Sequence, residues 1–142
     1  MTVKQILDQK GRNVVTVSPS MGTEEAVRFL ADNKIGAVVV TGAGGRIEGI
    51  LSERDIVRAV ARKGADALSA PISAIMTSKV KTCGQSHSIN QVMELMTNGR
   101  FRHLPVEEDG KLVGIISIGD VVRRRIEDVE REAEEIKAYI AS

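Results

Sequence analysis

Two serine–aspartate pairs are the residues of this chain whose types and spacing could bind a ligand. Ser52 precedes Asp55 by three residues, and Ser117 precedes Asp120 by the same interval. Each pair closes a short apolar run that begins with glycine, Gly-Ile-Leu-Ser or Gly-Ile-Ile-Ser. A serine hydroxyl and the amides of a helix N-terminus can bind a phosphate, and a carboxylate can accept two hydrogen bonds from a ribose cis-diol. The pattern therefore predicts two nucleotide sites.

The same spacing also has a purely structural interpretation. Ser-x-x-Asp is close to a capping box, in which both side chains satisfy backbone donors at the start of a helix. One copy alone would favour the cap, because such caps are common. The second copy shifts the balance toward ligand binding, and both interpretations stay open at this point.

The pairs belong to an internal repeat that covers the chain. Thr16 aligns with Thr82, and residues 38–40 align with residues 104–106. Two copies are too few for a solenoid, so we expect a pseudo-twofold pair with two equivalent clefts where the copies meet. We assign residues 1–70 to the first repeat with an N-terminal lead-in segment, and residues 71–142 to the second repeat with a C-terminal helix.

Each copy is expected to fold as strand, helix, strand, strand, helix, which makes an α/β fold. β-branched runs indicate the strands and apolar spacing of three and four indicates the helices. Thr23 is the expected N-cap of the first helix. The strands are expected at residues 14–17, 37–41, 47–52, 80–83, 104–107 and 112–117. The helices are expected near residues 24–33, 53–60, 88–98 and 118–142.

The two copies differ in charge. Arg102 and His103 precede the middle strand of the second copy, where the first copy has Gly36 and Ala37. These two side chains cannot both be buried without partners, and a phosphate would supply one. A solvated strand edge is the alternative for either residue alone. Arg54 could bind phosphate in the first copy, but we expect the Asp120 cleft to hold its phosphate better.

Composition argues against several classes of protein. The formal net charge of +1 gives no broad field for binding nucleic acid, and no run approaches the roughly 20 apolar residues of a membrane span. One cysteine and two histidines provide neither a catalytic set nor a metal site, so an enzyme is not expected. Cys83 aligns with Val17 and is expected to be buried. A single cysteine and no signal-peptide pattern lead us to expect a cytoplasmic protein.

The last predicted helix carries a second apolar stripe. Its apolar residues alternate spacings of four and three, which is typical of a helix that packs against another helix. We expect residues 127–142 to project from the domain and to pair with a second chain in a homodimer. Docking on its own domain is the alternative. We expect the basic residues 123–125 and the acidic run after them to pair within a solvated helix face. The stripe consists of Val122, Ile126, Val129, Ala133, Ile136 and Ile140.

The duplicated unit, both Gly-x-x-Ser-x-x-Asp elements and the stretch Arg-His-Leu-Pro-Val at residues 102–106 resemble a tandem pair of cystathionine-β-synthase (CBS) domains, a Bateman module. The resemblance covers essentially the whole chain and is greatest to small stand-alone CBS-pair proteins of bacteria and plants. It implies two pseudo-twofold-related β-α-β-β-α CBS repeats that form one module, followed here by the long C-terminal helix.

The resemblance also implies roles for individual residues. Asp55 and Asp120 would bind ribose, Ser52 and Ser117 would face the phosphate, and Ile118 would adjoin the second site. Arg102 and His103 would bind the phosphate of that second site. The segment before each first strand would line the opposite copy's cleft, which nominates Lys10, Arg12 and Val14 for one site and Met76, Thr77 and Val80 for the other.

The function implied by the resemblance is non-catalytic regulation. The module would sense energy or redox state by binding AMP, the most expected ligand, or ADP, ATP or NAD(H). A ligand-free interaction or dimerisation module and an S-adenosylmethionine-binding regulator are the alternatives. A homodimer and an unidentified regulated protein are the expected partners. With no tryptophan and three other aromatic residues, the base would contact aliphatic side chains, and the choice of adenine comes from the resemblance alone.

Overall fold

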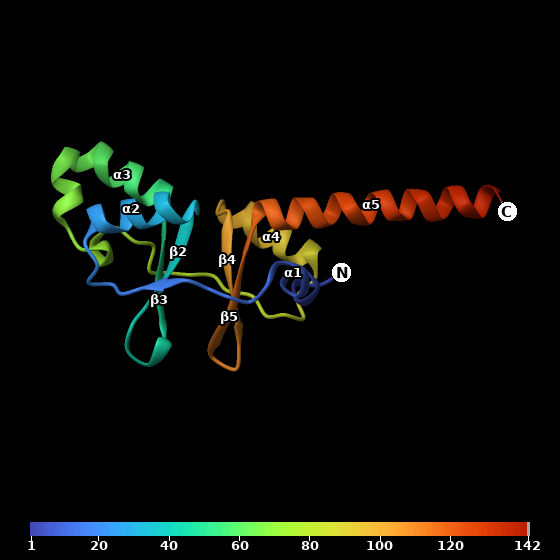
Figure 1. Ribbon diagram of the computed structural model, residues 1–142, viewed down its shortest axis with the longest axis horizontal. Coiled ribbons are helices and arrows are strands. Elements are labelled where there is room, and N and C mark those ends of the chain that lie inside the picture. The colour runs from blue at the N-terminus through green and yellow to red at the C-terminus, as the bar shows by residue number, and fades with distance from the viewer. Residues whose placement is uncertain (142) are drawn as a thin grey trace. The chain divides into compact units, whose positions relative to one another are not determined.

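The computed structural model describes residues 1–141, which divide into two compact units. The first, here the Asp55 unit, comprises residues 13–81 and the turn at residues 109–112. The second, here the Asp120 unit, comprises residues 1–12, 82–108 and 113–141. The N-terminal residues of the chain therefore belong with the second repeat. Figure 1 shows the order of the elements.

The Asp55 unit is built on a three-stranded sheet in the order β1 (Thr16–Val17), β2 (Ala37–Thr41), β3 (Ile47–Ser52). β1 is parallel to β2, and β3 is antiparallel to β2 with Val38 opposite Leu51. The helices of this unit are α2 (Thr23–Asn33) and α3 (Glu53–Lys63), and 3₁₀ turns follow at Gly64–Ser69 and Ile72–Ala74. The apolar core contains Ala26, Leu30, Val38, Val40, Leu51 and Ile72.

The glycine of each Gly-x-x-Ser element lies where a lead-in segment packs against a strand. The amide of Ile50 donates to Thr77 and the amide of Thr77 donates to Ile50, both at 2.9 Å. A Cβ on Gly49 would lie 2.8 Å from the Thr77 carbonyl oxygen, so this backbone approach requires glycine. A Cβ on Gly114 would lie 2.7 Å from a methyl group of Leu7. Both glycines therefore have a packing role.

The Asp120 unit contains β4 (His103–Glu108), which pairs with β5 (Lys111–Ser117), and all of β5 but its first two residues. It adds the helices α1 (Val3–Lys10), α4 (Ile89–Gly99) and α5 (Ile118–Ala141). Backbone bonds fasten α1 to the loop before α4, where the Val3 amide donates to His87 at 2.9 Å and the Lys4 amide to Gln85 at 3.0 Å. The core contains Val3, Ile6, Leu7, Cys83, Ile89, Val92, Met96, Leu104, Val106, Ile116 and Val121. The first helix of the chain thus completes the core of the second repeat.

The strand expected at residues 80–83 is wrong. Cys83 makes only an isolated parallel bridge to Val106, donating to Pro105 at 3.1 Å and accepting from Glu107 at 2.8 Å. The next bond of this register would run from the amide of Pro105 to Lys81, and proline has no N–H to donate. The first copy has Val39 at that place, and β1 forms beside it. Cys83 is buried, as expected, with 3% of its surface exposed.

Two further boundaries differ from expectation. The strand expected at residues 14–17 is confined to Thr16–Val17. The N-cap of α2 is Gly22 instead of Thr23. Thr23 is buried, and its hydroxyl donates to the Ala70 carbonyl at 2.7 Å, so the side chain fastens the helix to the loop after α3. Within residues 1–141, no helix has the length and apolar content that crossing a membrane requires.

Candidate functional site

The Ser52–Asp55 pair lies where β3 ends and α3 begins. The Ser52 hydroxyl accepts a hydrogen bond from the Asp55 amide at 3.3 Å, and Asp55 Oδ2 accepts from the Ser52 amide at 3.0 Å and from its hydroxyl at 3.2 Å. This reciprocal arrangement is a capping box. The structural interpretation of this motif is therefore confirmed, and any ligand would bind to groups that already cap the helix.

The second oxygen of Asp55 contacts the lead-in segment of the second repeat. The Thr77 hydroxyl donates to Asp55 Oδ1 at 3.1 Å. Both oxygens of Asp55 thus accept hydrogen bonds, and only 7% of the residue surface is exposed. The carboxylate is consequently well satisfied within the protein.

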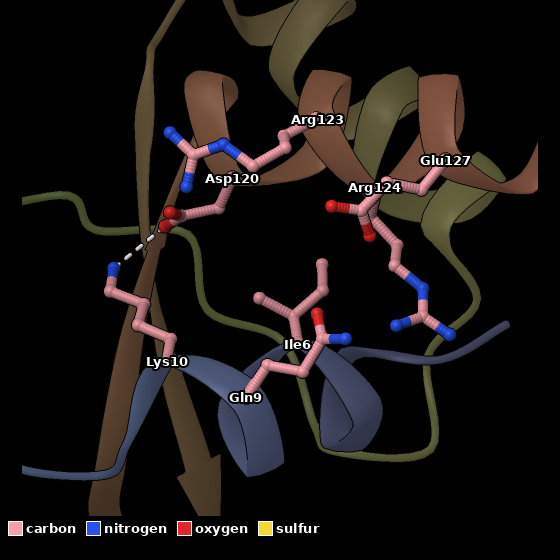
Figure 2. A pocket seen from close by; sticks show the side chains of 7 residues that line it. All are labelled: Ile6, Gln9, Lys10, Asp120, Arg123, Arg124 and Glu127. Atoms are coloured by element: carbon pink, nitrogen blue, oxygen red, sulfur yellow. Dashed lines mark hydrogen bonds and ion pairs between the residues drawn. The ribbon is translucent and has the colours of Figure 1, made fainter.

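The Ser117–Asp120 pair repeats this geometry between β5 and α5. The Ser117 hydroxyl accepts from the Asp120 amide at 3.2 Å, and Asp120 Oδ2 accepts from the Ser117 amide at 2.9 Å. Lys10, the last residue of α1, donates to Asp120 Oδ2 at 2.6 Å (Figure 2). It also donates to the Ile115 carbonyl at 2.8 Å. The bonds from the Lys10 ammonium and from the Ser117 amide both go to Oδ2.

The electrostatic balance at Asp120 favours the carboxylate anion. Burial raises the pKa of Asp120, but hydrogen bonds from Lys10 and Ser117, together with the positive charge of Lys10, outweigh burial and lower the pKa below its ordinary value of 3.8. The side chain keeps 16% of its surface exposed. The site therefore presents a charged acceptor beside a cation.

This pKa shift predicts a pH dependence of stability. Because the pKa of Asp120 is lower in the folded protein, the interaction stabilises the fold above the ordinary pKa, and the stabilisation is lost as the pH falls through the folded-state pKa. In urea unfolding series from about pH 6 to about pH 2, wild type should lose more unfolding free energy than Asp120→Asn. Parallel losses in the two proteins would contradict the proposed role of the Lys10–Asp120 pair.

A pocket of about 160 Å³ opens beside this ion pair (Figure 2). It lies between α1 and the first turns of α5, and three of the side chains that line it are cationic while two are anionic. Pockets that enclose a drug-sized ligand measure roughly 300–1,000 Å³, so this one suits a phosphate or ribose and not a whole nucleotide. Its lining residues are Ile6, Gln9, Lys10, Asp120, Arg123, Arg124 and Glu127.

Comparison with known proteins identifies the family. A model of the CBS domain matches residues 3–62 and again residues 72–127, most of the chain in two tandem copies. The chain belongs to the CBS-domain family. The resemblance stated from the sequence is confirmed, and so is the mixed α/β fold with two CBS domains and a long C-terminal helix.

Solved structures of other CBS proteins are similar over most of the chain. The CBS-domain protein ATU1752 from Agrobacterium tumefaciens is 54% identical, with a TM-score of 0.86 over 88% of this chain and 99% of that one. The protein PAE2072 from Pyrobaculum aerophilum, solved with AMP, is 30% identical, with a TM-score of 0.74 over 84% and 89%. The CBS pair of MJ0100, solved with 5-methylthioadenosine and S-adenosyl-L-methionine, is 25% identical, with a TM-score of 0.80 over 90% and 98%.

Each CBS repeat has an equivalent backbone hydrogen bond at the start of the helix that follows its Ser-x-x-Asp strand. The Ile118 amide donates to the Arg102 carbonyl at 2.8 Å, and in the first repeat the Glu53 amide donates to Gly36 at 3.0 Å. Arg102 therefore adjoins the Ser117–Asp120 pair, with its side chain exposed, and half-buried His103 begins β4. Ile118, the first residue of α5, is exposed.

The contacts and exposure of the remaining predicted site residues are as follows. The Arg12 guanidinium donates to Asp8 at 2.6 Å and to Gln85 at 3.0 Å, so the structure does not bring it to Asp120. Met76 packs against Gly49. The side chains of Val14 and Val80 are half-buried, and Arg54 is exposed on the first turn of α3. The ligand-binding roles of these CBS residues stay predictions.

The pocket of this CBS protein contains residues that the sequence reasoning missed. Arg123 and Arg124 follow Asp120 by three and four positions, which places them on one helix face, and this spacing could have revealed them. Pairing within the helix is confirmed, since Arg124 lies 3.4 Å from Asp128. The expectation of a solvated face is wrong here, because Asp128 is buried and only 12% of the Arg124 side chain is exposed.

Proposed function

We propose that this CBS-pair protein is a non-catalytic regulatory module that binds an adenosine nucleotide, with its main site at the Ser117–Asp120 pair. AMP is the first candidate, and ADP, ATP and NAD(H) are the others. The observation that carries the proposal is the Asp120 carboxylate, which is partly exposed, lies at a helix N-terminus and adjoins a pocket lined by three cationic side chains and by Glu127.

The contrast between the two aspartates supports this choice of main site. Asp55 has both oxygens engaged and lies almost entirely inside the protein. Asp120 is more exposed, and its pocket is lined by Lys10, Arg123 and Arg124 beside the single further anion Glu127. A phosphate beside these cations would form charge-assisted hydrogen bonds. The site of the first repeat would need Thr77 to release Asp55 before both oxygens could bind a ligand.

The ligands named for two related structures support the adenosine part. AMP is named for PAE2072, and 5-methylthioadenosine and S-adenosyl-L-methionine are named for MJ0100. All three molecules contain adenosine, and they differ in what the ribose carries. S-adenosylmethionine is therefore the second candidate ligand, but its sulfonium cation is a poorer match than a phosphate for a pocket with three cationic side chains.

Isothermal titration calorimetry tests the proposal. The titrants are AMP, ATP, NADH, GMP and S-adenosylmethionine, and the proteins are wild type, Asp120→Ala and the matched Asp55→Ala. We expect an adenosine ligand to bind wild type, and we expect Asp120→Ala to weaken it at least about tenfold, or 1.4 kcal/mol, and more than Asp55→Ala does. Both variants lose a helix cap worth about 1 kcal/mol, so thermal unfolding must show that each is folded.

Other outcomes would contradict the proposal. No heat with any ligand would favour a ligand-free interaction module. Equal affinities in wild type and Asp120→Ala would remove the assigned main site.

The proposal also covers the oligomeric state, the compartment and the partner of the protein. We propose that it acts as a homodimer in the cytoplasm and that the bound nucleotide controls a separate protein partner. The exposed apolar stripe of α5 supports self-association, and a single buried cysteine fits a reducing compartment.

A further inference from the structure

We infer that two copies of this chain pair through the apolar stripe of α5, with the two helices parallel and in register. The stripe comprises Val122, Ile126, Val129, Ala133, Ile136 and Ile140, and its exposed large side chains range from 43% exposed at Val122 to 76% at Ile140. The inference rests on the proposed homodimer but not on nucleotide binding. It specifies the surface and the direction of the pairing.

The stripe is not the face that α5 turns toward its own unit. Val121 and Asp128 are buried, and Arg124 is nearly so. At about 100° per residue these three positions lie about 100° to 160° around the helix from the centre of the stripe. Figure 1 shows α5 running on past α1 and α4 of the same unit. The helix can therefore contact its own unit and a second copy at the same time.

The spacing of the stripe fits a helical partner. Its residues alternate intervals of four and three along the whole helix, which keeps them on one seam when two helices supercoil. Removing a stripe of this length from water stabilises the helix pair in proportion to the apolar area that is buried. Without a partner, the apolar stripe would stay exposed to water. A second helix with the same length and apolar spacing would cover it completely.

The charges beside the stripe select a second copy in the parallel direction. In a parallel, in-register pair, Arg125 faces Glu130 of the partner copy and Glu132 faces Lys137 of the partner copy. The symmetry repeats both opposite-charge pairs, and every residue of the stripe meets its own counterpart. No like charges face each other at these four positions.

The antiparallel alternatives fit less well. Full antiparallel overlap would place Glu130 opposite Glu130, Glu132 opposite Glu132 and Arg123 opposite Lys137, all of like charge. Sliding the helices until Arg125 faces Glu132 removes this repulsion, but it leaves both Ile136 and Ile140 without a partner in the stripe. Only the parallel arrangement both covers the whole stripe and pairs opposite charges.

Disulfide trapping distinguishes these arrangements. In the parallel pair, Ala133→Cys places two thiols against each other at the seam and should give a rapid crosslinked dimer under mild oxidation. In the shifted antiparallel pair the two cysteines would lie about 16 Å apart, at roughly 1.5 Å per residue, and would not crosslink. The matched control Glu134→Cys points away from the seam and should crosslink far more slowly. The native Cys83 is buried, with a pKa raised by burial to about 12, so wild type should stay uncrosslinked.

Light scattering of unmodified protein separates this inference from the proposed homodimer. We expect a dimer, and we expect Ile136→Glu to weaken it at least about tenfold, because a charge would be buried at the seam. Ile136 is 60% exposed and is not part of its unit's core. The variant should therefore unfold at the same midpoint as wild type diluted until it is monomeric. A monomeric wild type would overturn both proposals. A trimer would likewise overturn both, whereas a dimer in which Ala133→Cys does not crosslink would overturn only the α5 pairing.

Discussion

Replacing Leu7 with alanine should lower the free energy of unfolding by about 2–5 kcal/mol, the range for a buried leucine. Leu7 is fully buried, and its methyl groups lie against Gly114 of β5. Its neighbours Val3 and Ile6 belong to the same core as Ile116. The lost side chain would leave a cavity between α1 and β5, so the second repeat would lose stability through a substitution in the first helix of the chain.

Urea denaturation measures this effect. The matched control is Val57→Ala, which also shortens an apolar side chain but at a position that is 66% exposed. It should change the free energy of unfolding by no more than about 0.5 kcal/mol. A Leu7→Ala effect as small as that of the control would mean that α1 does not pack on the Asp120 unit in solution.

Replacing Lys10 with glutamate should weaken nucleotide binding by about 100-fold, or 2.7 kcal/mol. Lys10 donates to Asp120 Oδ2 at 2.6 Å and lines the pocket beside it. A glutamate there would face both the Asp120 carboxylate and the ligand phosphate, and unlike a deletion it adds like-charge repulsion, which costs several kcal/mol at such contacts. The same substitution removes a hydrogen bond that lowers the pKa of Asp120.

Calorimetry with the nucleotide that binds wild type most tightly measures this loss. Lys4→Glu makes the same change of charge on an exposed turn of the same helix, outside the pocket, and serves as the control. Binding should be nearly unchanged in the control at moderate salt, where exposed charges are screened. If both variants weakened binding equally, the effect would be one of net charge, and Lys10 would have no specific role.

Because the chain contains an internal repeat, many of its helices and strands could be predicted from the sequence. The second copy of Gly-x-x-Ser-x-x-Asp located both strand-to-helix junctions, and apolar spacing located α2, α4 and α5 within a residue or two of their observed bounds. The expected strand at residues 80–83 failed because a strand needs a partner with free N–H groups, and Pro105 lies across from it. Thr23 failed as a cap because the Ala70 carbonyl, 47 residues away, takes its hydroxyl. The division at residue 70 and the clefts expected between the copies stay predictions.

The sequence by itself determined the duplicated α/β architecture, the buried cysteine and the two Ser–Asp pairs, because each of these depends on local pattern. Only the tertiary structure decided which residues complete the pairs. Lys10 reaches Asp120 across 110 positions of the chain, and Thr77 reaches Asp55 across 22. Neither the distance nor the number of engaged oxygens can be read from spacing, because hydrogen bonds form between groups that the folded core brings together. The difference between a closed Asp55 and an accessible Asp120 is therefore a property of the packed structure.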